Sequence, residues 1–263
     1  MDSSYKEKII VKEADEALEG KDLCVEDFTT QQYRELIRLA KQNYSFVFFD
    51  GIPFGERFVL WRHDIDFSVN RAFALAEIEL DEGVCSTYFI NPHSEFYNPF
   101  EKSQTCLLKR IVGMGHKIGL HFDAAYHETN DEKQLDEQVS YEAKLLERCL
   151  GTRPSVFSFH NPTVFLPPCE EKAYGGLINC QAEFIKEQIP YVSDSNGYWR
   201  FRRLREVLEN AEDPCLQVLT HPVWWQETPM LPRERILRSM EGRATATMEF
   251  YDELLKANNR KNL

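Results

Sequence analysis

Two patterns of apolar positions alternate along most of the chain: short continuous runs, and longer segments with apolar residues three and four positions apart. The runs are typical of buried strands, and the three-and-four spacing is typical of amphipathic helices. We expect strands over 58–61, 85–90, 118–121, 156–160, 191–194 and 216–221. We expect helices over 69–82, 103–113, 135–150 and 237–254, with surface loops over the Pro- and Gly-punctuated segment 161–190. Strands that alternate with helices indicate βαβ units, and therefore an α/β fold with a parallel sheet covered by helices.

The first 57 residues do not follow this alternation. Residues 1–27 are charge-mixed and weakly patterned, which predicts a peripheral arm or a short helix. A helical spacing of apolar residues follows, with the members Tyr33, Leu36, Ile37 and Ala40. We therefore divide the chain into an N-terminal arm with a helix and strand extension, 1–57, and one main domain, 58–263.

Length, composition and charge narrow the class of protein. The chain has 263 residues, of which 43% are hydrophobic, so it can bury a large core, and disordered and small disulfide-rich classes are excluded. Lysine and arginine total 31 against 43 acidic residues, for a net charge of −12. A charge of this sign repels phosphate backbones and anionic lipid, which argues against nucleic-acid and membrane-surface partners.

The sequence also carries information on compartment. Its apolar runs are far shorter than the roughly 18 residues that a membrane span needs, and the first residues lack a signal-peptide pattern. The seven cysteines are scattered without a Cys-x-x-Cys pair, which argues against a disulfide framework and against a cysteine zinc cage. We expect a cytoplasmic protein.

Five predicted strands end in histidine or aspartate. The residues at these strand ends are Asp64 with Asp66, His121, His160, Asp194 and His221. The C-terminal ends of parallel strands meet on one rim, both in a barrel and in an open doubly wound sheet, and periodicity does not choose between these two. The five sets of side chains are therefore expected to converge on one site.

Carboxylate and imidazole groups without thiolate suit a divalent ion such as zinc, with iron, cobalt, nickel or manganese as alternatives. Asp64 and Asp66 are two positions apart and share one face if this segment is a strand. One carboxylate would then hold the metal while the other takes a proton from a water molecule that the metal acidifies. His221, from a distant strand, would protonate a leaving amine or alkoxide. This arrangement indicates metal-assisted hydrolysis of an amide or an ester.

These segments resemble the motifs of the polysaccharide deacetylases, carbohydrate esterases with a chitooligosaccharide-deacetylase domain. The matching segments, in the family's order, are Arg62-His63-Asp64-Ile65-Asp66, Gly115-His116-Lys117-Ile118-Gly119-Leu120-His121, Phe159-His160-Asn161-Pro162, Asp194-Ser195-Asn196-Gly197-Tyr198-Trp199 and Leu219-Thr220-His221-Pro222. They lie within 58–226. The resemblance implies a distorted (β/α)7 barrel and removal of an N-acetyl group from a sugar. It also implies roles for Asp64 as catalytic base, Asp66 and His121 as metal ligands, and His221 as acid.

The chain departs from the family pattern at two positions. The family's second metal histidine follows the first by four residues, where this chain has Ala125, and the nearest histidine is His127. His160 stands where the family usually has an arginine that orients the base; a divergent branch with His-Asp-x-Asp at the first motif has histidine there. His160 and His127 are both candidates for the third ligand, and we favour His160 because it ends a strand on the predicted rim.

Four further residues have two interpretations each. Asp194 either orients His221, as a carboxylate does in a catalytic triad, or caps the turn that follows it. Trp199, Trp224 and Trp225 either form a wall on which a sugar ring stacks or pack in the core. The first interpretation assigns all four residues to the site.

The sequence therefore predicts a metal-dependent deacetylase that acts on a small N-acetylated carbohydrate or glycan precursor. Two alternatives remain, an amidase for another non-peptide C–N bond and a catalytically silent sugar-binding barrel. The oligomeric state is not indicated by the sequence.

Overall fold

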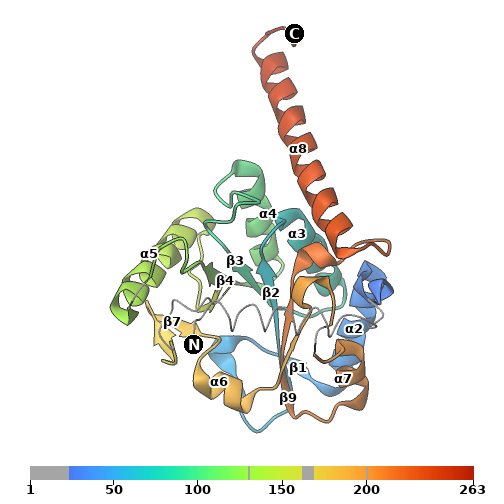
Figure 1. The fold of residues 1–263 in the computed structure, drawn as a ribbon, viewed down its shortest axis with the longest axis vertical. Coiled ribbons are helices and arrows are strands. Elements are labelled where there is room, and N and C mark those ends of the chain that lie inside the picture. Colours follow the sequence, from blue (N-terminus) through green and yellow to red (C-terminus); the bar gives the residue numbers. More distant parts are fainter. Residues whose placement is uncertain (1–23, 130, 162–168, 200) are drawn as a thin grey trace, which may run out of the picture.

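The computed structural model describes residues 24–129, 131–161, 169–199 and 201–263 (Figure 1). Most of the predicted arm, residues 1–23, and Pro162 of the aromatic motif lie outside the described residues. Within the described residues, no helix combines the length and the apolar character that crossing a bilayer requires.

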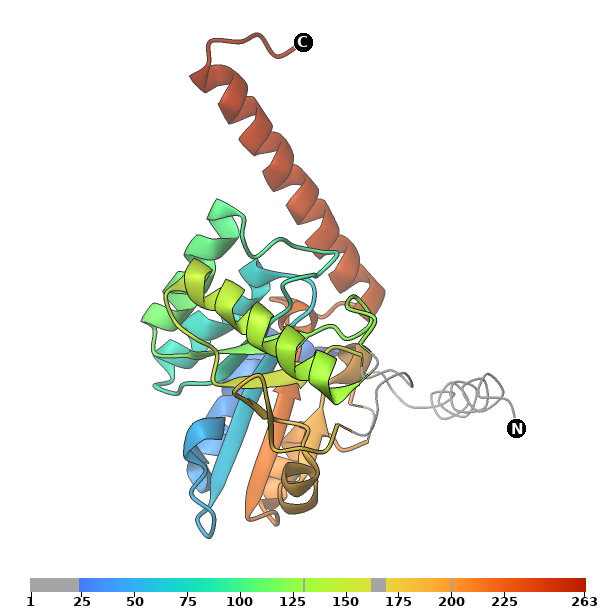
Figure 2. The same ribbon diagram turned by 90° about the vertical axis from the view of Figure 1, so that its left-hand side faces the viewer.

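One curled sheet organises the chain. Its strands are β1 (Ser45–Phe46), β2 (Phe58–Ile65), β3 (Thr87–Ile90), β4 (Lys117–Phe122), β5 (Val156–Phe159), β6 (Ala173–Tyr174), β7 (Leu177–Asn179), β8 (Tyr191–Ser193) and β9 (Cys215–Thr220). The order is β6-β7-β5-β4-β3-β2-β9-β8, with β1 paired to β2, and every pair is parallel except β6 with β7. Helices flank the sheet (Figures 1 and 2). The α/β fold class is confirmed, and the architecture is a half-barrel consistent with the predicted distorted (β/α)7 barrel.

The helices begin and end where local chemistry requires. They are α2 (Thr30–Asn43), α3 (Val69–Asp81), α4 (Lys102–Gly113), α5 (Glu132–Leu150), α6 (Glu183–Gln188), α7 (Leu204–Asn210) and α8 (Pro232–Ala257). Ser68 caps α3 by accepting a hydrogen bond from the backbone N–H of Arg71 at 3.2 Å. Gly151 ends α5 in the left-handed conformation, with φ of 79°, which glycine adopts without strain. Helix boundaries that the sequence predicted from caps and glycines therefore agree closely with the structure.

The segment 161–190 differs from its prediction as loops. It contains the hairpin β6–β7 and the helix α6. Gly175 and Gly176, both at positive φ, form the two-residue turn of the hairpin, a conformation that favours glycine. The strands on either side have only two and three residues, too short to show a period in the sequence.

The described part of the predicted N-terminal extension is joined to the sheet. Ser45 of β1 pairs with Phe58 of β2, and α2 packs against α3 and α7. Arg34 of α2 donates to Glu82 at 2.7 Å, which ties α2 to the end of α3. The division of the chain at residue 57 stays a prediction, but the extension and the sheet form a continuous structure here.

Helix α8 runs away from the rest of the molecule (Figures 1 and 2). Its predicted apolar positions do lie on a helix, but they are exposed: Leu237 by 54%, Tyr251 by 51% and Leu254 by 45%. Within this fully described helix only Arg235 is buried. Periodicity therefore identified the helix, while these three apolar side chains are not part of the core.

The sheet places the predicted residues side by side. In the order β5-β4-β3-β2-β9-β8, each strand except β3 carries one of the predicted sets at or just beyond its C-terminal end. Close packing between neighbouring strands depends on Gly119 of β4, where a Cβ atom would lie 2.6 Å from the ring of Phe89 in β3. Gly119, the second glycine of that motif, is therefore needed for close packing of β4 against β3 beneath the rim.

Candidate metal centre

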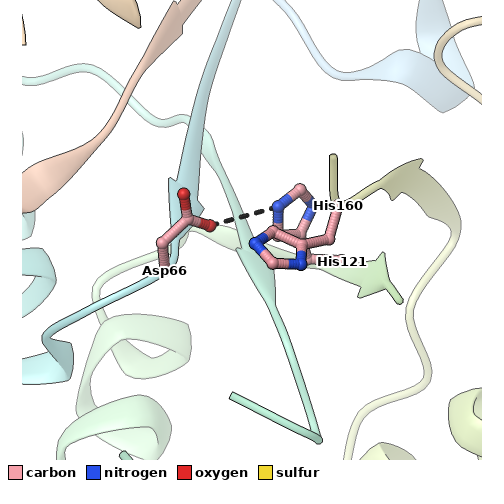
Figure 3. Close-up of side chains that lie close together, drawn as sticks. All are labelled: Asp66, His121 and His160. Atoms are coloured by element: carbon pink, nitrogen blue, oxygen red, sulfur yellow. Dashed lines mark ion pairs between the residues drawn. The ribbon is translucent and has the colours of Figure 1, made fainter. Parts of the chain in front are cut away.

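Three side chains from three strands meet at the rim. Asp66 directly follows β2, His121 lies in β4 and His160 directly follows β5. Each offers one ligand atom, and these atoms lie within 4.8 Å of one another. The Asp66 carboxylate and the two imidazole rings point toward a common centre (Figure 3), with Nε2 of His121 3.2 Å from Oδ1 of Asp66. These are the three residues that the sequence analysis proposed as ligands.

Each of the two imidazole rings has a hydrogen-bond partner at Nδ1. Nδ1 of His160 lies 3.1 Å from Oδ2 of Asp123, and Nδ1 of His121 lies 2.7 Å from Oγ of Ser158. When Nδ1 donates its proton to such a partner, the lone pair of Nε2 is left for a metal ion. The amide of Asn161, 3.2 Å from Nε2 of His160, is consistent with a lone pair there.

Ser158 and Asp123 were not identified from the sequence. Ser158 is fully buried in the otherwise apolar strand β5, and an isolated polar residue in a buried strand is a usable signal for a hydrogen-bonding role. Asp123 directly follows β4, so it satisfies the same strand-end criterion as the five predicted sets.

The donor set fits a divalent metal ion. Oδ1 of Asp66 is buried and has no hydrogen-bond partner among the residues that the structure describes. Burial disfavours its charge, but the contact with His121 and the charges of His121 and His221 outweigh burial and lower the pKa of Asp66 to about 2. One ionised carboxylate and two imidazoles, with room for further ligands, is the composition of an open zinc-type site.

Asp64, the predicted base, lies buried beside this cluster. Its Oδ2 accepts a hydrogen bond from Arg62 at 2.8 Å and lies 3.7 Å from Nδ1 of His121. Its Oδ1 is buried without a hydrogen-bond partner in the described part of the chain. Arg62 and Asp64 share one face of β2, while the intervening His63 contacts Glu79 on the other face, at 2.7 Å. Arg62, and not His63, therefore donates a side-chain hydrogen bond to Asp64.

His221 approaches the cluster from β9. Its Nε2 lies 3.7 Å from Oδ2 of Asp66, and its Nδ1 lies 2.6 Å from Oδ1 of Asp194. Burial alone would lower the pKa of His221, but the charge and hydrogen bond of Asp194 outweigh burial and raise it to about 9. The His221 ring is therefore protonated on both nitrogens and positively charged at neutral pH, as a general acid must be.

A cleft of about 690 Å³ lies over these residues. Asp66, His160 and His221 reach it from the strand ends. Its aromatic lining consists of Phe67, Phe96, Tyr126 and Trp224. The cleft combines ionisable groups with flat apolar surfaces, which is typical of sites for small polar molecules with apolar faces.

The structure does not bring all three predicted tryptophans to this cleft. Trp224 lines it, but Trp225 is fully buried, with its ring centroid 4.9 Å from that of Tyr33. Trp199 stacks on Phe28, with centroids 5.3 Å apart. Trp199 and Trp225 therefore pack in the core, the second of the two interpretations.

His127, the alternative third ligand, lies in a different group. Its Nε2 is 2.5 Å from Oε1 of Glu142 on α5. The loop that carries His127, six residues after His121, does not bring this histidine into the group of Asp66. The proposed ligand set therefore stays Asp66, His121 and His160, the three residues that share a centre.

Comparisons with known proteins give weak matches in structure. No protein-family model and no curated protein matches the sequence. The chitin deacetylase from the fungal pathogen Colletotrichum lindemuthianum is 17% identical with a TM-score of 0.44, covering 70% of this chain and 81% of that chain. A family 4 acetyl xylan esterase from Clostridium thermocellum, in complex with a cobalt ion, is 15% identical with a TM-score of 0.39, covering 70% and 84%.

A CE4 family pseudoenzyme from Bacillus anthracis is 13% identical with a TM-score of 0.41, covering 73% of this chain. This chain spans only 62% of the length of that protein. The matched proteins belong to the class of carbohydrate deacetylases and esterases that the motifs resemble, and they include enzymes and pseudoenzymes alike. The identities and TM-scores are too low for these matches to indicate a function.

Proposed function

We propose that this chain is a metal-dependent hydrolase that removes an acetyl group from an N-acetylated sugar or glycan precursor. The observation that carries the proposal is the convergence of ligand atoms of Asp66, His121 and His160 within 4.8 Å. The buried Asp64 lies 3.7 Å from His121, and Asp66, His160 and His221 line one cleft. In the proposal these three residues hold a divalent ion, with zinc as first choice and iron, cobalt, nickel or manganese as alternatives. When bound, such an ion supplies Lewis acidity toward water and toward an amide carbonyl.

Asp64 takes the role of general base. Arg62, 2.8 Å from its Oδ2, balances the charge of the carboxylate in the protein interior and holds its orientation. Its Oδ1, which has no hydrogen-bond partner among the described residues, is the atom left to accept a proton from the attacking water.

His221 takes the role of general acid. Asp194 holds its Nδ1, so the proton on Nε2 is the one available to a leaving amine. The amine of a sugar is a poor leaving group until it is protonated, and a histidine with a pKa of about 9 is charged when the substrate arrives. The acid and the base thus approach the reaction centre from neighbouring strands, β9 and β2.

The cleft favours a small carbohydrate substrate. Phe67 packs against Phe96 and Trp224, with ring centroids 4.4 and 5.9 Å away, and Phe96, 37% exposed, is the most accessible of the three rings. Aromatic surfaces bind the apolar faces of pyranose rings. The net charge of −12 disfavours polyanionic substrates.

Acetate release from a panel of acetamido sugars and their oligomers tests the proposal. We expect the protein purified with zinc or cobalt to release acetate from at least one member, and Asp64→Asn to keep the metal and release none. Amine release without acetate would instead indicate an amidase for another non-peptide C–N bond. Sugar binding without turnover by metal-loaded protein would indicate a silent sugar-binding barrel and overturn the proposal.

A further inference from the structure

A second group of two histidines and a carboxylate lies beside the cleft, apart from the proposed catalytic cluster. Its members are His93, in the segment after β3, His127, in the segment after β4, and Glu142 on α5. Each offers one ligand atom, and these atoms lie within 4.8 Å of one another. The proposed hydrolytic chemistry uses none of the three residues.

Both histidines contact the same carboxylate oxygen of Glu142. Its Oε1 lies 2.5 Å from Nε2 of His127 and 2.7 Å from Nε2 of His93. Glu142 is fully buried, and the side chains of His93 and His127 are exposed by only 20% and 15%. A carboxylate in such a place requires compensation of its charge, because burial removes it from water.

Hydrogen bonds account for only part of this compensation. Among the described residues, Oε2 of Glu142 has no hydrogen-bond partner, and neither has Nε2 of His93, despite its distance of 2.7 Å from Oε1. The His93 contact is therefore close without the angles of a hydrogen bond. Buried polar atoms without a hydrogen-bond partner are rare in folded proteins, and a bound cation is one way in which they are satisfied.

Aromatic stacking holds both imidazoles in place. His93 stacks on Tyr126 with ring centroids 3.6 Å apart, and His127 stacks on Phe122 with an angle of 4° between the rings. The two imidazole planes are nearly perpendicular, at 88°, with centroids 5.3 Å apart. Their Nε2 atoms thus approach Oε1 of Glu142 from different directions.

We propose that His93, His127 and Glu142 form a second site for a divalent metal ion, separate from Asp66, His121 and His160. Two imidazoles and one carboxylate suit zinc and neighbouring transition metals rather than magnesium or calcium, which prefer oxygen. Because His93 and Tyr126 also line the cleft, an ion here fixes one wall of it to α5.

Metal stoichiometry tests the second site. After saturation with zinc and removal of excess ion, we expect two zinc ions per wild-type chain by elemental analysis. We expect one in Glu142→Gln and two in Glu137→Gln, a matched change at an exposed position of the same helix. Equal zinc content in Glu142→Gln and the wild type would overturn the proposal and leave a plain hydrogen-bonded group.

A second pair of variants avoids the buried glutamate, whose replacement can prevent folding. We expect His160→Ala to bind one cobalt(II) ion and to retain a visible absorption band, and the double variant His160→Ala/His93→Gln to lose it. A band that persists in the double variant would contradict the assignment. Neither readout depends on acetate release, so a failure of the proposed reaction leaves this test intact.

Discussion

Both carboxylate oxygens of Asp194 accept the backbone N–H of His221. The backbone N–H of His221 lies 3.1 Å from Oδ1 and 2.9 Å from Oδ2, and its ring Nδ1 lies 2.6 Å from Oδ1. The indole N–H of Trp225 donates to Oδ2 from the core side, at 3.2 Å. One buried aspartate therefore positions the strand end and the ring together, which leaves Nε2 of His221 directed toward Asp66.

Replacing this carboxylate tests its role. In Asp194→Asn the negative charge beside His221 is lost, so we expect the pKa of the ring to fall from about 9 toward its ordinary 6.5. Near pH 7.5 only about a tenth of the rings is then protonated, so kcat for acetate release falls by roughly tenfold. NMR titration of metal-free protein measures the pKa. An unchanged pKa would show that Asp194 only caps the turn.

The third proposed ligand has its own test. His160→Ala removes one of three donors, so we expect acetate release to be abolished at low zinc concentration and restored only partly at high concentration. Chelation of the wild-type protein should abolish release in the same way, with recovery on addition of zinc. Release by His160→Ala equal to the wild type at low zinc would exclude His160 as a ligand.

Arg62 and Asp64 form a buried ion pair in the same strand. Arg62→Leu leaves the carboxylate without its cation, so we expect the free energy of unfolding to fall by about 3 kcal/mol. Arg62→Lys keeps the charge but loses the guanidinium geometry and the contact with Cys180, so its loss should be smaller. Urea unfolding measures both variants. Equal stability of Arg62→Leu and the wild type would show that the pair contributes nothing.

Glu79 makes stability depend on acid pH. It is fully buried and accepts hydrogen bonds from Ser86 at 2.6 Å and Tyr88 at 2.8 Å. Burial would raise its pKa, but the charge and hydrogen bond of His63, the charge of His116 and the hydrogen bond of Ser86 outweigh burial and lower the pKa from 4.5 to about 2. Because the folded-state pKa lies below the unfolded one, this stabilisation is complete above pH 4.5 and is lost as the pH falls toward 2.

Glu79→Gln should therefore reduce the free energy of unfolding by about 3 kcal/mol at pH 7. The difference from the wild type should shrink between pH 4.5 and 2, a window that follows from the shift in pKa. Denaturant unfolding at a series of pH values measures it, with the exposed Glu137→Gln as control. A difference that is constant over the whole range would show that the carboxyl charge does not matter.

The strand-end residues could be predicted from the sequence because a parallel sheet has one rim. Each short apolar run predicts a strand, and in a parallel sheet all strands run in the same direction. The polar residue that ends each run is therefore expected at the C-terminal rim of the sheet. Asp66, His121 and His160 needed no more than this rule to be placed together. The resemblance to a known family then distributed roles among them, and the role of Asp64 as base stays a prediction.

Contacts between distant side chains could not be predicted in this way. The hydrogen bond between His121 and Ser158 depends on the register of β5 against β4, which pairs these two residues directly. The group of His93, His127 and Glu142 depends on the placement of α5 across the segments that follow β3 and β4. Tryptophan gave no signal of direction, since a buried Trp225 and a cleft-lining Trp224 are neighbours in the sequence.

The projecting helix α8 has a consequence for cooperativity of unfolding. With 26 residues it is about 39 Å long, and burial of its side chains contributes little to holding its outer turns. Isolated helices are only marginally stable in water, so these turns should open without the sheet. Amide hydrogens near Tyr251 are therefore expected to exchange with solvent orders of magnitude faster than those of β2, and the molecule would unfold in two separate steps.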